Sequence, residues 1–305
     1  MSPSNSRLTG GLLAAGSAIL FACKGVFAKA LFLRGVDYQT LTLMRALLAL
    51  PLFWGLAARQ GFRGMDGAPL HKQPADLLWL TGGAGALCYG VGALLDFHAL
   101  ELIDVSMERA LLFSYPALVV LFASVRDRRW PGIAVTAAML LTYAGICLVV
   151  GGFDVSAWRE NLVGALLVLA CAITFAFFFI AGERCIPKLG GLGFTLIAMT
   201  GAAGLVLAQF VAVRPLRAIV ELDAASWLLL IALAVLCMVV PSLMQAGGIR
   251  RIGAVRGAII STVGPPAAML LGAGLLHEHP TLWQVLGTAL IVVGVLVIGR
   301  FETRS

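Results

Sequence analysis

The chain has 305 residues, of which 60% are hydrophobic and 12% are charged, and its formal net charge is +7. Average soluble domains carry roughly twice this share of charged residues. The composition therefore excludes an ordinary soluble enzyme and predicts a protein that lipid solvates, in keeping with a mean hydropathy of +0.98. One membrane span needs about 20 apolar residues, so the length allows roughly ten spans and leaves no separate soluble domain.

The positive charge does not indicate a nucleic-acid partner, because Lys and Arg are spread over the short breaks between apolar runs. The six cysteines form no Cys-x-x-Cys pair and no metal-ligand spacing, so we interpret them as small buried apolar residues. The sequence therefore predicts no metal site and no cofactor. The first apolar run is too long for a signal peptide and is expected to remain as a span.

In chain order, the apolar runs predict ten transmembrane helices, at 9–31, 38–58, 77–98, 105–125, 131–151, 161–181, 191–213, 226–247, 254–276 and 281–299. The expected fold class is therefore all-α integral membrane. The breaks between the runs are short, as helix hairpins require, except at 59–76 and 214–225.

The distribution of basic residues predicts the orientation of these helices. If the N-terminus is inside, the inner segments hold 13 Lys and Arg residues and the outer segments hold 4. Basic residues favour the cytoplasmic side of a membrane. We therefore expect a multi-pass protein of the cytoplasmic (inner) membrane with both termini in the cytoplasm.

The sequence contains an internal repeat, because Leu94–Gly145 aligns without a gap on Leu243–Gly294 after a shift of 149 positions. The aligned identities are Leu94 with Leu243, Ile103 with Ile252, Pro116 with Pro265, Leu121 with Leu270, Leu141 with Leu290, and Gly145 with Gly294. We expect a single membrane domain built from two five-helix repeats, at 9–151 and 161–300. Five is odd, so the second repeat enters the membrane inverted, and such repeats place a substrate cavity between the halves near the midplane.

Three prolines, Pro116, Pro241 and Pro265, fall inside the predicted helices. Proline removes a backbone hydrogen bond and favours a kink, which a membrane helix tolerates where a neighbour or a cavity satisfies the freed carbonyl. The prolines are candidate kink sites for conformational change, and static kinks are the open alternative.

The last part of the chain carries the pattern of a known family. Its elements are Ala246-Gly-Gly-Ile-Arg-Arg-Ile-Gly-Ala254, Gly264-Pro265, Leu276-His-Glu278, Gly287 and Gly294. With the ten-helix, two-repeat plan over 9–300, this pattern resembles the EamA branch of the drug/metabolite transporter superfamily. A glutamate after the ninth helix is typical of that family, and Glu278 stands there; the first repeat departs from the pattern, with Arg129 at the aligned position. The resemblance implies a transporter, and the length and plan are similar to those of aromatic amino acid exporters.

Charged residues inside membrane spans are costly and mark candidate functional sites. Here they gather in the first half, as Lys24, Lys29, Arg45, Asp96, Glu108 and Arg109. Glu101 lies in the break between the third and fourth predicted helices. The near balance of charge predicts mutual pairing. Two interpretations stay open, a structural ion-pair network and an outer gate or substrate contact, and we assign Lys29, Arg45, Glu108 and Arg109 to gating or ion pairing.

Helical spacing predicts which residues line the cavity. Tyr89 and Asp96 share one face of the third helix, and Glu108 and Tyr115 share one face of the fourth. Lys24 shares a face with Phe21 and needs an anion, which Asp96, Glu108 or a substrate carboxylate could provide. The predicted cavity residues are Lys24, Phe21, Tyr89, Asp96, Tyr115, Phe175, Phe178 and Gln245, the last being the repeat mate of Asp96.

These features favour an exporter of small metabolites, with aromatic or large neutral amino acids as the leading substrates and alternating access as the mechanism. An exporter of nucleosides, vitamins or cationic drugs is the main alternative. A membrane enzyme acting on lipid or acyl groups is more remote, because no catalytic set of residues is evident. The expected partners are a small-molecule substrate and the lipid bilayer, without nucleic acid, and we expect a monomer.

Overall fold

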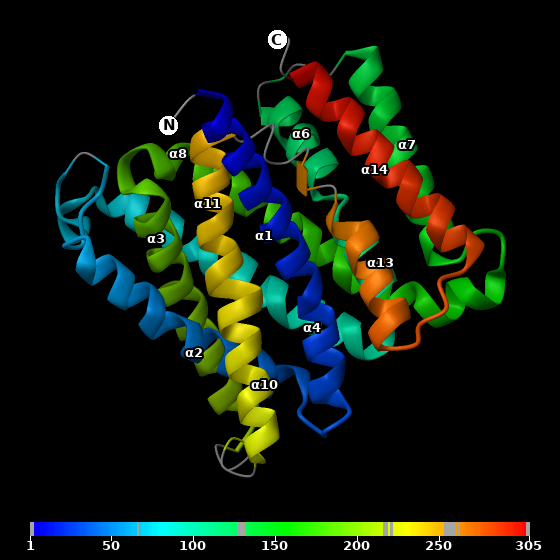
Figure 1. Ribbon diagram of the computed structural model, residues 1–305, viewed down its shortest axis with the longest axis horizontal. Helices are drawn as coiled ribbons and strands as arrows, with labels where there is room; N and C mark the ends of the chain where they lie inside the picture. The colour runs from blue at the N-terminus through cyan, green and yellow to red at the C-terminus, as the bar shows by residue number, and fades with distance from the viewer. Residues whose placement is uncertain are drawn as a thin grey trace.

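The computed structural model describes residues 3–65, 67–126, 128, 132–215, 219, 222–252, 260–261 and 263–302. These residues form helices joined by turns, and among them the only β-type pairing is an isolated bridge between Arg63 and Pro69 (Figure 1). The helices are α1 Pro3–Phe32, α2 Tyr38–Arg59, α3 Ala75–Gly85, α4 Ala93–Leu102, α5 Val105–Leu112, α6 Tyr115–Arg126, α7 Ile133–Val150, α8 Val155–Val213, α10 Ala224–Ala234, α11 Val240–Ile252, α13 Gly264–Leu275 and α14 Leu282–Glu302. A 3₁₀ turn, η1, covers Leu70–Lys72, and the π-helical segments η2 and η3 cover Ala86–Gly92 and Val235–Val239.

Within the described residues, 6 helical segments are long and apolar enough to cross a membrane. They are Leu8–Phe32, Tyr38–Arg59, Ala75–Leu102, Val155–Gly182, Arg184–Val213 and Ala224–Gln245. Shorter apolar helices cover Thr136–Val150 and Leu282–Val297. Large apolar side chains such as Trp79 and Ile133 are almost fully exposed at 82% and 91%, which is favourable only where hydrocarbon replaces water. The helical, lipid-solvated architecture expected from the composition is present.

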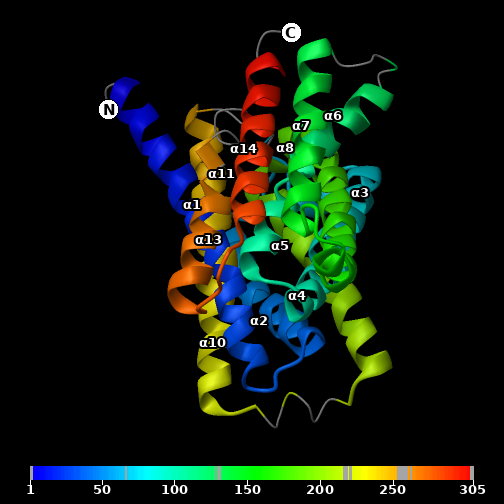
Figure 2. The same cartoon turned by 90° about the vertical axis from the view of Figure 1, so that its right-hand side faces the viewer.

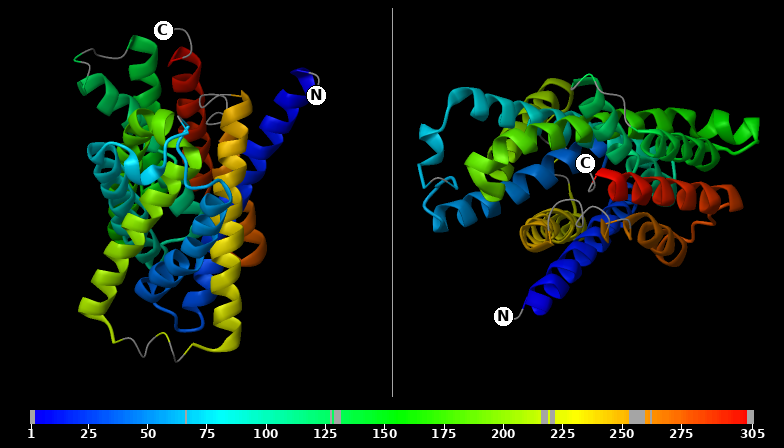
Figure 3. Two further views of the ribbon diagram at one scale, coloured as in Figure 1. Left: turned by 90° about the vertical axis from the view of Figure 1, so that its left-hand side faces the viewer. Right: turned by 90° about the horizontal axis from the view of Figure 1, so that it is seen from above.

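The two termini lie at one end of the molecule, and the turn between α1 and α2 lies at the other end together with the start of α10 (Figures 1 and 2). We call these the inner end and the outer end. Seen from above, α1 lies between the run of α10 and α11 on one side and α13 on the other (Figure 3).

Local residues explain where several helices begin and turn. Asp37, Asp154 and Asp223 stand directly before α2, α8 and α10, and each accepts a hydrogen bond from a backbone N–H of the first helical turn. These bonds satisfy donors that have no partner inside the helix. Within α8 the chain turns at Gly190, where φ is 72° and ψ is 162°, a conformation that is essentially restricted to glycine. The turn divides α8 into a first arm, 155–189, and a second arm, 191–213.

The predicted fourth helix, 105–125, is not continuous, because the turn at Phe113–Ser114 separates α5 from α6. Pro116 is the second residue of α6, and Pro265 is the second residue of α13. The expectation that these prolines kink the middle of a helix was therefore wrong: they stand at helix starts, where the missing N–H costs nothing. Pro241 follows η3 inside a helical run that continues through α11.

Helix boundaries repeat along the chain with the same shift of 149 positions that aligns the sequence. The shift carries the start of α3 onto that of α10, η2 onto η3, α6 onto α13 and α7 onto α14. α7 and α14 lie side by side and run in opposite directions (Figures 1 and 2). Their backbones approach closely at Gly145 and Gly287, where an added Cβ on either residue would lie 2.7 or 2.5 Å from the carbonyl oxygen of the other.

A candidate site at a buried charge network

Three charged side chains from three helices meet inside the protein. The ammonium of Lys24 on α1 forms ion pairs with Asp96 on α4 and with Glu108 on α5, the second at 3.2 Å. The three residues are 7%, 4% and 0% exposed. A buried charge is tolerated only when other charges or hydrogen bonds compensate for lost hydration, and the two carboxylates provide this compensation for Lys24. The pairing expected for the deepest lysine is present.

Two arginines stand beside this network with different partners. Arg109, on α5, donates a hydrogen bond from a terminal nitrogen to the backbone carbonyl of Phe21. Arg45, on α2, has its guanidinium carbon 4.9 Å from the centre of the Phe97 ring, and the Lys24 nitrogen lies 5.4 Å from the same ring. Phe97 thus contacts both cations, a favourable arrangement because an aromatic face attracts positive charge. The spacing of the sequence did not single out Phe97.

Glu278 reaches from the connection between α13 and α14 to the start of α5. Its carboxylate accepts hydrogen bonds from the backbone N–H groups of Val105, at 2.8 Å, and Ser106, at 3.2 Å, and from the Ser106 hydroxyl at 2.6 Å. Asp104 occupies the position before α5 but makes no capping bond through its side chain. Glu278 therefore supplies the acceptor and the negative charge that a helix N-terminus favours, and it ties the second half to the helix that carries Glu108.

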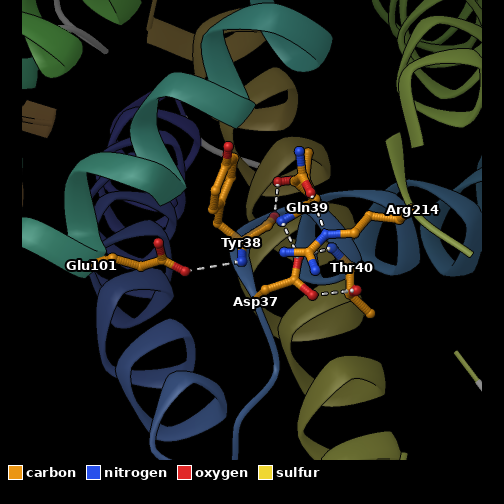
Figure 4. Close-up of polar contacts among 7 residues, drawn as sticks. Asp37, Tyr38, Gln39, Thr40, Glu101 and Arg214 are labelled. Atoms are coloured by element: carbon orange, nitrogen blue, oxygen red, sulfur yellow. Dashed lines mark hydrogen bonds and ion pairs between the residues drawn. The ribbon is translucent and has the colours of Figure 1, made fainter. Parts of the chain in front are cut away.

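The outer end contains a second set of polar contacts, around the start of α2 (Figure 4). Asp37 caps α2 by accepting from the N–H groups of Gln39 and Thr40. Arg214, at the end of α8, donates to the Gln39 side chain at 2.7 Å, and Glu101 on α4 accepts from the Tyr38 N–H at 3.1 Å. Glu101 is therefore engaged at the surface and does not join the network around Lys24.

Aromatic side chains gather between η2, α6 and the first arm of α8. The Tyr89 ring lies edge-on to Phe175 and Phe178, with centroids 6.3 and 5.0 Å apart. Tyr115 is 6.0 Å from Phe175 and stacks on Phe179 at 5.0 Å. The structure thus brings together four of the aromatic residues assigned to the cavity. We call Tyr89, Tyr115, Phe175 and Phe178 the aromatic group.

The remaining candidates, Phe21, Gln245 and Lys29, do not take part in the ion pairs and ring contacts described above. Phe21 is partly exposed, and its backbone carbonyl makes the contact with Arg109. Gln245, on α11, and Lys29, on α1, are both partly buried. Within the described residues, neither side chain forms a hydrogen bond or ion pair. α1 connects to the second half through the Ser17 hydroxyl, which donates to the Pro241 carbonyl at 2.9 Å.

A large cavity of about 690 Å³ lies elsewhere, between α2, α3 and the second arm of α8. Trp54, Phe62 and Trp79 are among its lining residues, and none of the residues assigned to the substrate cavity lines it. No group of three or more His, Cys, Asp or Glu side chains that could hold a metal ion occurs among the described residues.

Sequence reasoning missed or left open three contributors to the site. Phe97 lies next to Asp96, and Ser106 lies just before Glu108, but nothing in the helical spacing marked them. Gly272 admits the Glu278 carboxylate, since an added Cβ would lie 2.3 Å from Oε2 of Glu278. The glutamate itself was visible as a family feature, although its partner on α5 was not.

Membrane-spanning helices that enclose a buried, polar network define an integral, multi-pass membrane protein with a candidate site inside the bilayer. The chain belongs to the EamA-like transporter family, whose model matches residues 8–151 and 162–300. This confirms the resemblance drawn from the sequence, and the protein is a membrane transporter of this type.

Two curated relatives span nearly the whole chain. "Uncharacterized transporter YcbK" of Bacillus subtilis (strain 168) is 32% identical over 273 residues, which cover 88% of this chain and 86% of the relative. "Uncharacterized inner membrane transporter YicL" of Salmonella typhimurium is 26% identical over 292 residues, 94% of each chain. A solved structure titled "Crystal structure of protein" covers 98% of this chain and 100% of its own, with a TM-score of 0.65 and 19% identity, and so shares the fold.

Proposed function

We propose that the protein exports small metabolites across the inner membrane, with aromatic or large neutral amino acids as its substrates. The observation that carries the proposal is the buried network of Lys24, Asp96 and Glu108. The aromatic group accompanies it, since Tyr89 lies on the same helical run as Asp96. Charges of both signs match the two charged groups of an amino acid, and aromatic rings match an apolar side chain. Charges inside a membrane protein are energetically costly, so their retention indicates a functional role.

The proposed mechanism is alternating access between two inverted five-helix repeats, around a site near the midplane. The family model matches the chain twice, in segments that correspond to the two repeats. The common shift of helix starts and the opposite directions of α7 and α14 support the inversion. Contacts of α1 with α11 and α13 support a position between the halves for the helix that carries Lys24.

The proposed orientation has both termini in the cytoplasm and ten transmembrane helices. The excess of Lys and Arg in the segments assigned to the inside supports it, as does the position of both termini at one end (Figure 1). The words "inner membrane" in the name of the Salmonella relative agree with this location. We propose that the protein acts as a monomer.

Transport into liposomes that contain the purified protein tests the proposal. We expect labelled phenylalanine or leucine to enter faster than in protein-free liposomes, and the same assay with and without a pH gradient measures coupling to protons. Lys24→Ala and Asp96→Asn are expected to reduce this uptake, since each removes one partner of the network. Normal uptake by both variants would refute the assignment of the site.

The same assay separates the alternative functions. Uptake of a nucleoside, a vitamin or a cationic drug without uptake of amino acids would keep the transporter and replace its substrate. A chemically altered product in the vesicles would indicate an enzyme. If none of the tested solutes moves across the membrane, the proposed substrate classes are refuted.

A further inference from the structure

Arg45 is a buried cation without an anion. It lies on α2 and is 7% exposed. Its Nε and one terminal nitrogen are buried and have no hydrogen-bond partner, and within the described residues it forms no ion pair. Its contact is the face of Phe97. A ring face attracts a guanidinium, but it offers no acceptor along the N–H directions, so these donors remain available.

The charges around Arg45 do not balance without a further negative group. Lys24, Arg45 and Arg109 carry three positive charges, and Asp96 and Glu108 carry two negative charges, both directed at Lys24. Arg109 is held by a neutral carbonyl. In surroundings that exclude water, an excess positive charge is unfavourable until an anion joins it. A carboxylate at Arg45 would supply the missing counter-charge at that position, and the ammonium of the same ligand would lie against the two acids, so the net charge of the group would stay as it is.

The two carboxylates in turn have acceptor atoms to spare. Oδ1 of Asp96 and Oε2 of Glu108 are buried and have no hydrogen-bond partner. Lys24, which pairs with both acids, lies over the same Phe97 ring as Arg45. The network thus presents unused guanidinium donors and unused carboxylate acceptors in one region, the arrangement that a ligand with a carboxylate and an ammonium would satisfy.

We propose that Arg45 binds the carboxylate of the transported substrate, while the free oxygens of Asp96 and Glu108 accept its ammonium; this rests on the proposed export of amino acids and specifies how they are recognised. An arginine suits this role because its planar fork can bind both oxygens of a carboxylate. Lys24 then acts as the fixed counter-ion that holds the two acids in place. The substrate class is the α-amino acids, in preference to amines or uncharged nucleosides.

Three ligands of similar shape test the carboxylate contact and the ammonium contact separately. They are phenylalanine, 3-phenylpropionate, which lacks the ammonium, and phenethylamine, which lacks the carboxylate. Calorimetry with the full-length protein in nanodiscs measures the affinity of each ligand for the wild type, Arg45→Gln, Arg45→Lys and Arg184→Gln. Arg184 is the matched control, because it is an exposed arginine whose surface ion pair with Asp76 lies on other helices.

We expect Arg45→Gln to weaken phenylalanine and 3-phenylpropionate by about 10- to 100-fold, the value of a charge-assisted hydrogen bond, and to leave phenethylamine unchanged. Arg45→Lys, which keeps the charge and loses the fork, should weaken the two carboxylates less, and Arg184→Gln should change none of the affinities. Equal weakening of all three ligands, or no weakening, would overturn the proposal. If Arg45→Gln does not fold, the wild type still decides, because phenethylamine that binds as tightly as phenylalanine contradicts a carboxylate site.

The outcomes also separate this inference from the proposed function. Binding of 3-phenylpropionate that depends on Arg45, with no binding of phenylalanine, keeps the carboxylate site and removes the amino acid. Binding of phenethylamine alone, unaffected by Arg45, removes the carboxylate site and points to cationic substrates.

Discussion

The helix that carries Tyr89 and Asp96 can be compared with the helix in the corresponding place of the second half. α3 and α10 begin 149 positions apart, and the π-helical segments η2 and η3 that follow them begin at the same interval. The side chains differ, because the shift aligns Asp96 with Gln245 and Tyr89 with Met238. The backbone is therefore repeated, whereas the buried charge and the aromatic hydroxyl occur in one half.

This difference separates packing from recognition. π-Helical turns are rare in proteins, and those that occur are often found at functional sites. Their presence in both halves indicates that both helices need this geometry, whatever side chains they carry. Charge in only one half gives the site a polarity that two identical halves would lack. A substrate with two different charged groups would then bind in one orientation.

Among the substitutions that test this difference between the halves, removal of Lys24 should lower the stability of the protein most. Lys24→Met leaves Asp96 and Glu108 buried without their cation, and breaking a buried pair costs about 3–5 kcal/mol. We expect the Tm of the purified protein to fall by about 10 °C. Gln245→Met is the comparison in the second half, at the repeat mate of Asp96, and we expect a cost below about 1 kcal/mol because no charge is left unpaired.

A compensating variant checks the cause. Lys24→Met combined with Asp96→Asn and Glu108→Gln removes all three charges together, and we expect most of the lost Tm to return. If the triple variant is as unstable as Lys24→Met, loss of packing rather than loss of charge explains the effect. Equal destabilisation by Gln245→Met would show that the halves are not as different as we infer.

The glycines that the repeat aligns should behave alike, in contrast to the charges. A Cβ added to Gly145 would lie 2.7 Å from the carbonyl oxygen of Gly287. A Cβ added to Gly294 would lie 2.2 Å from the hydroxyl oxygen of Thr142. Both lie where α7 packs on α14, and overpacking such contacts costs about 1–3 kcal/mol. Gly145→Ala and Gly294→Ala should therefore lower the Tm by similar amounts.

Gly55→Ala is the control for these two variants, because the added Cβ meets nothing within 4 Å. Alanine favours the helix over glycine, so this variant should keep or raise the Tm by a few degrees. A large loss at only one of Gly145 and Gly294 would contradict the equivalence of α7 and α14.

Glu278 connects the second half to α5 in the first half through its hydrogen bonds to Val105 and Ser106. Its removal should lower the stability less than the changes above. Glu278→Gln weakens the cap on α5, for which we expect a loss of about 1 kcal/mol. Transport should fall as well, because α5 positions Glu108 and Arg109. Glu160→Gln makes the same chemical change at an exposed position and should alter neither property. Unchanged transport and unchanged Tm in Glu278→Gln would leave the cap without a role.

The sequence was sufficient to predict the features that depend on local pattern. Apolar run length gives the helical membrane architecture, and the interval between like segments gives the repeat. The charge count predicted that Lys24 would pair, and it pairs with Asp96 and Glu108. The shared face of Tyr89 and Asp96 stays a prediction, because Tyr89 lies in the π-helical segment η2. Each of these follows from residues that are close in the chain or from composition.

Features that depend on contacts between distant helices could not be predicted. The acceptor for Ser106 is Glu278, 172 positions away, and only packing of α13 against α5 brings the two together. Near balance of charge suggested that every cation would find an acid, yet Glu101 bonds to the Tyr38 N–H and Arg45 is left without one. The turn at Phe113–Ser114 likewise interrupts a helix, 105–125, that the sequence pattern predicted as continuous.

Asp104 provides the smallest test of the contact between the halves. Partial burial raises the pKa of its carboxyl and the neighbouring Glu278 carboxylate adds to the rise, while Lys29 opposes it. A carboxyl whose pKa is raised by folding favours the folded state at low pH and loses this contribution as pH rises through its folded pKa. Asp104→Asn should therefore raise the Tm at pH 7, by no more than about 2 °C, and leave it unchanged at a pH low enough to protonate the acid.

The gain from Asp104→Asn should shrink when Glu278→Gln is already present, because part of the unfavourable interaction joins these two side chains. A double-mutant cycle at pH 7 measures this coupling. A gain that is the same with and without Glu278 would assign the effect to burial alone. A gain that falls would show that Glu278 stabilises α5 through its cap while it repels the adjacent acid, so that the connection between the halves is held by opposing electrostatic terms.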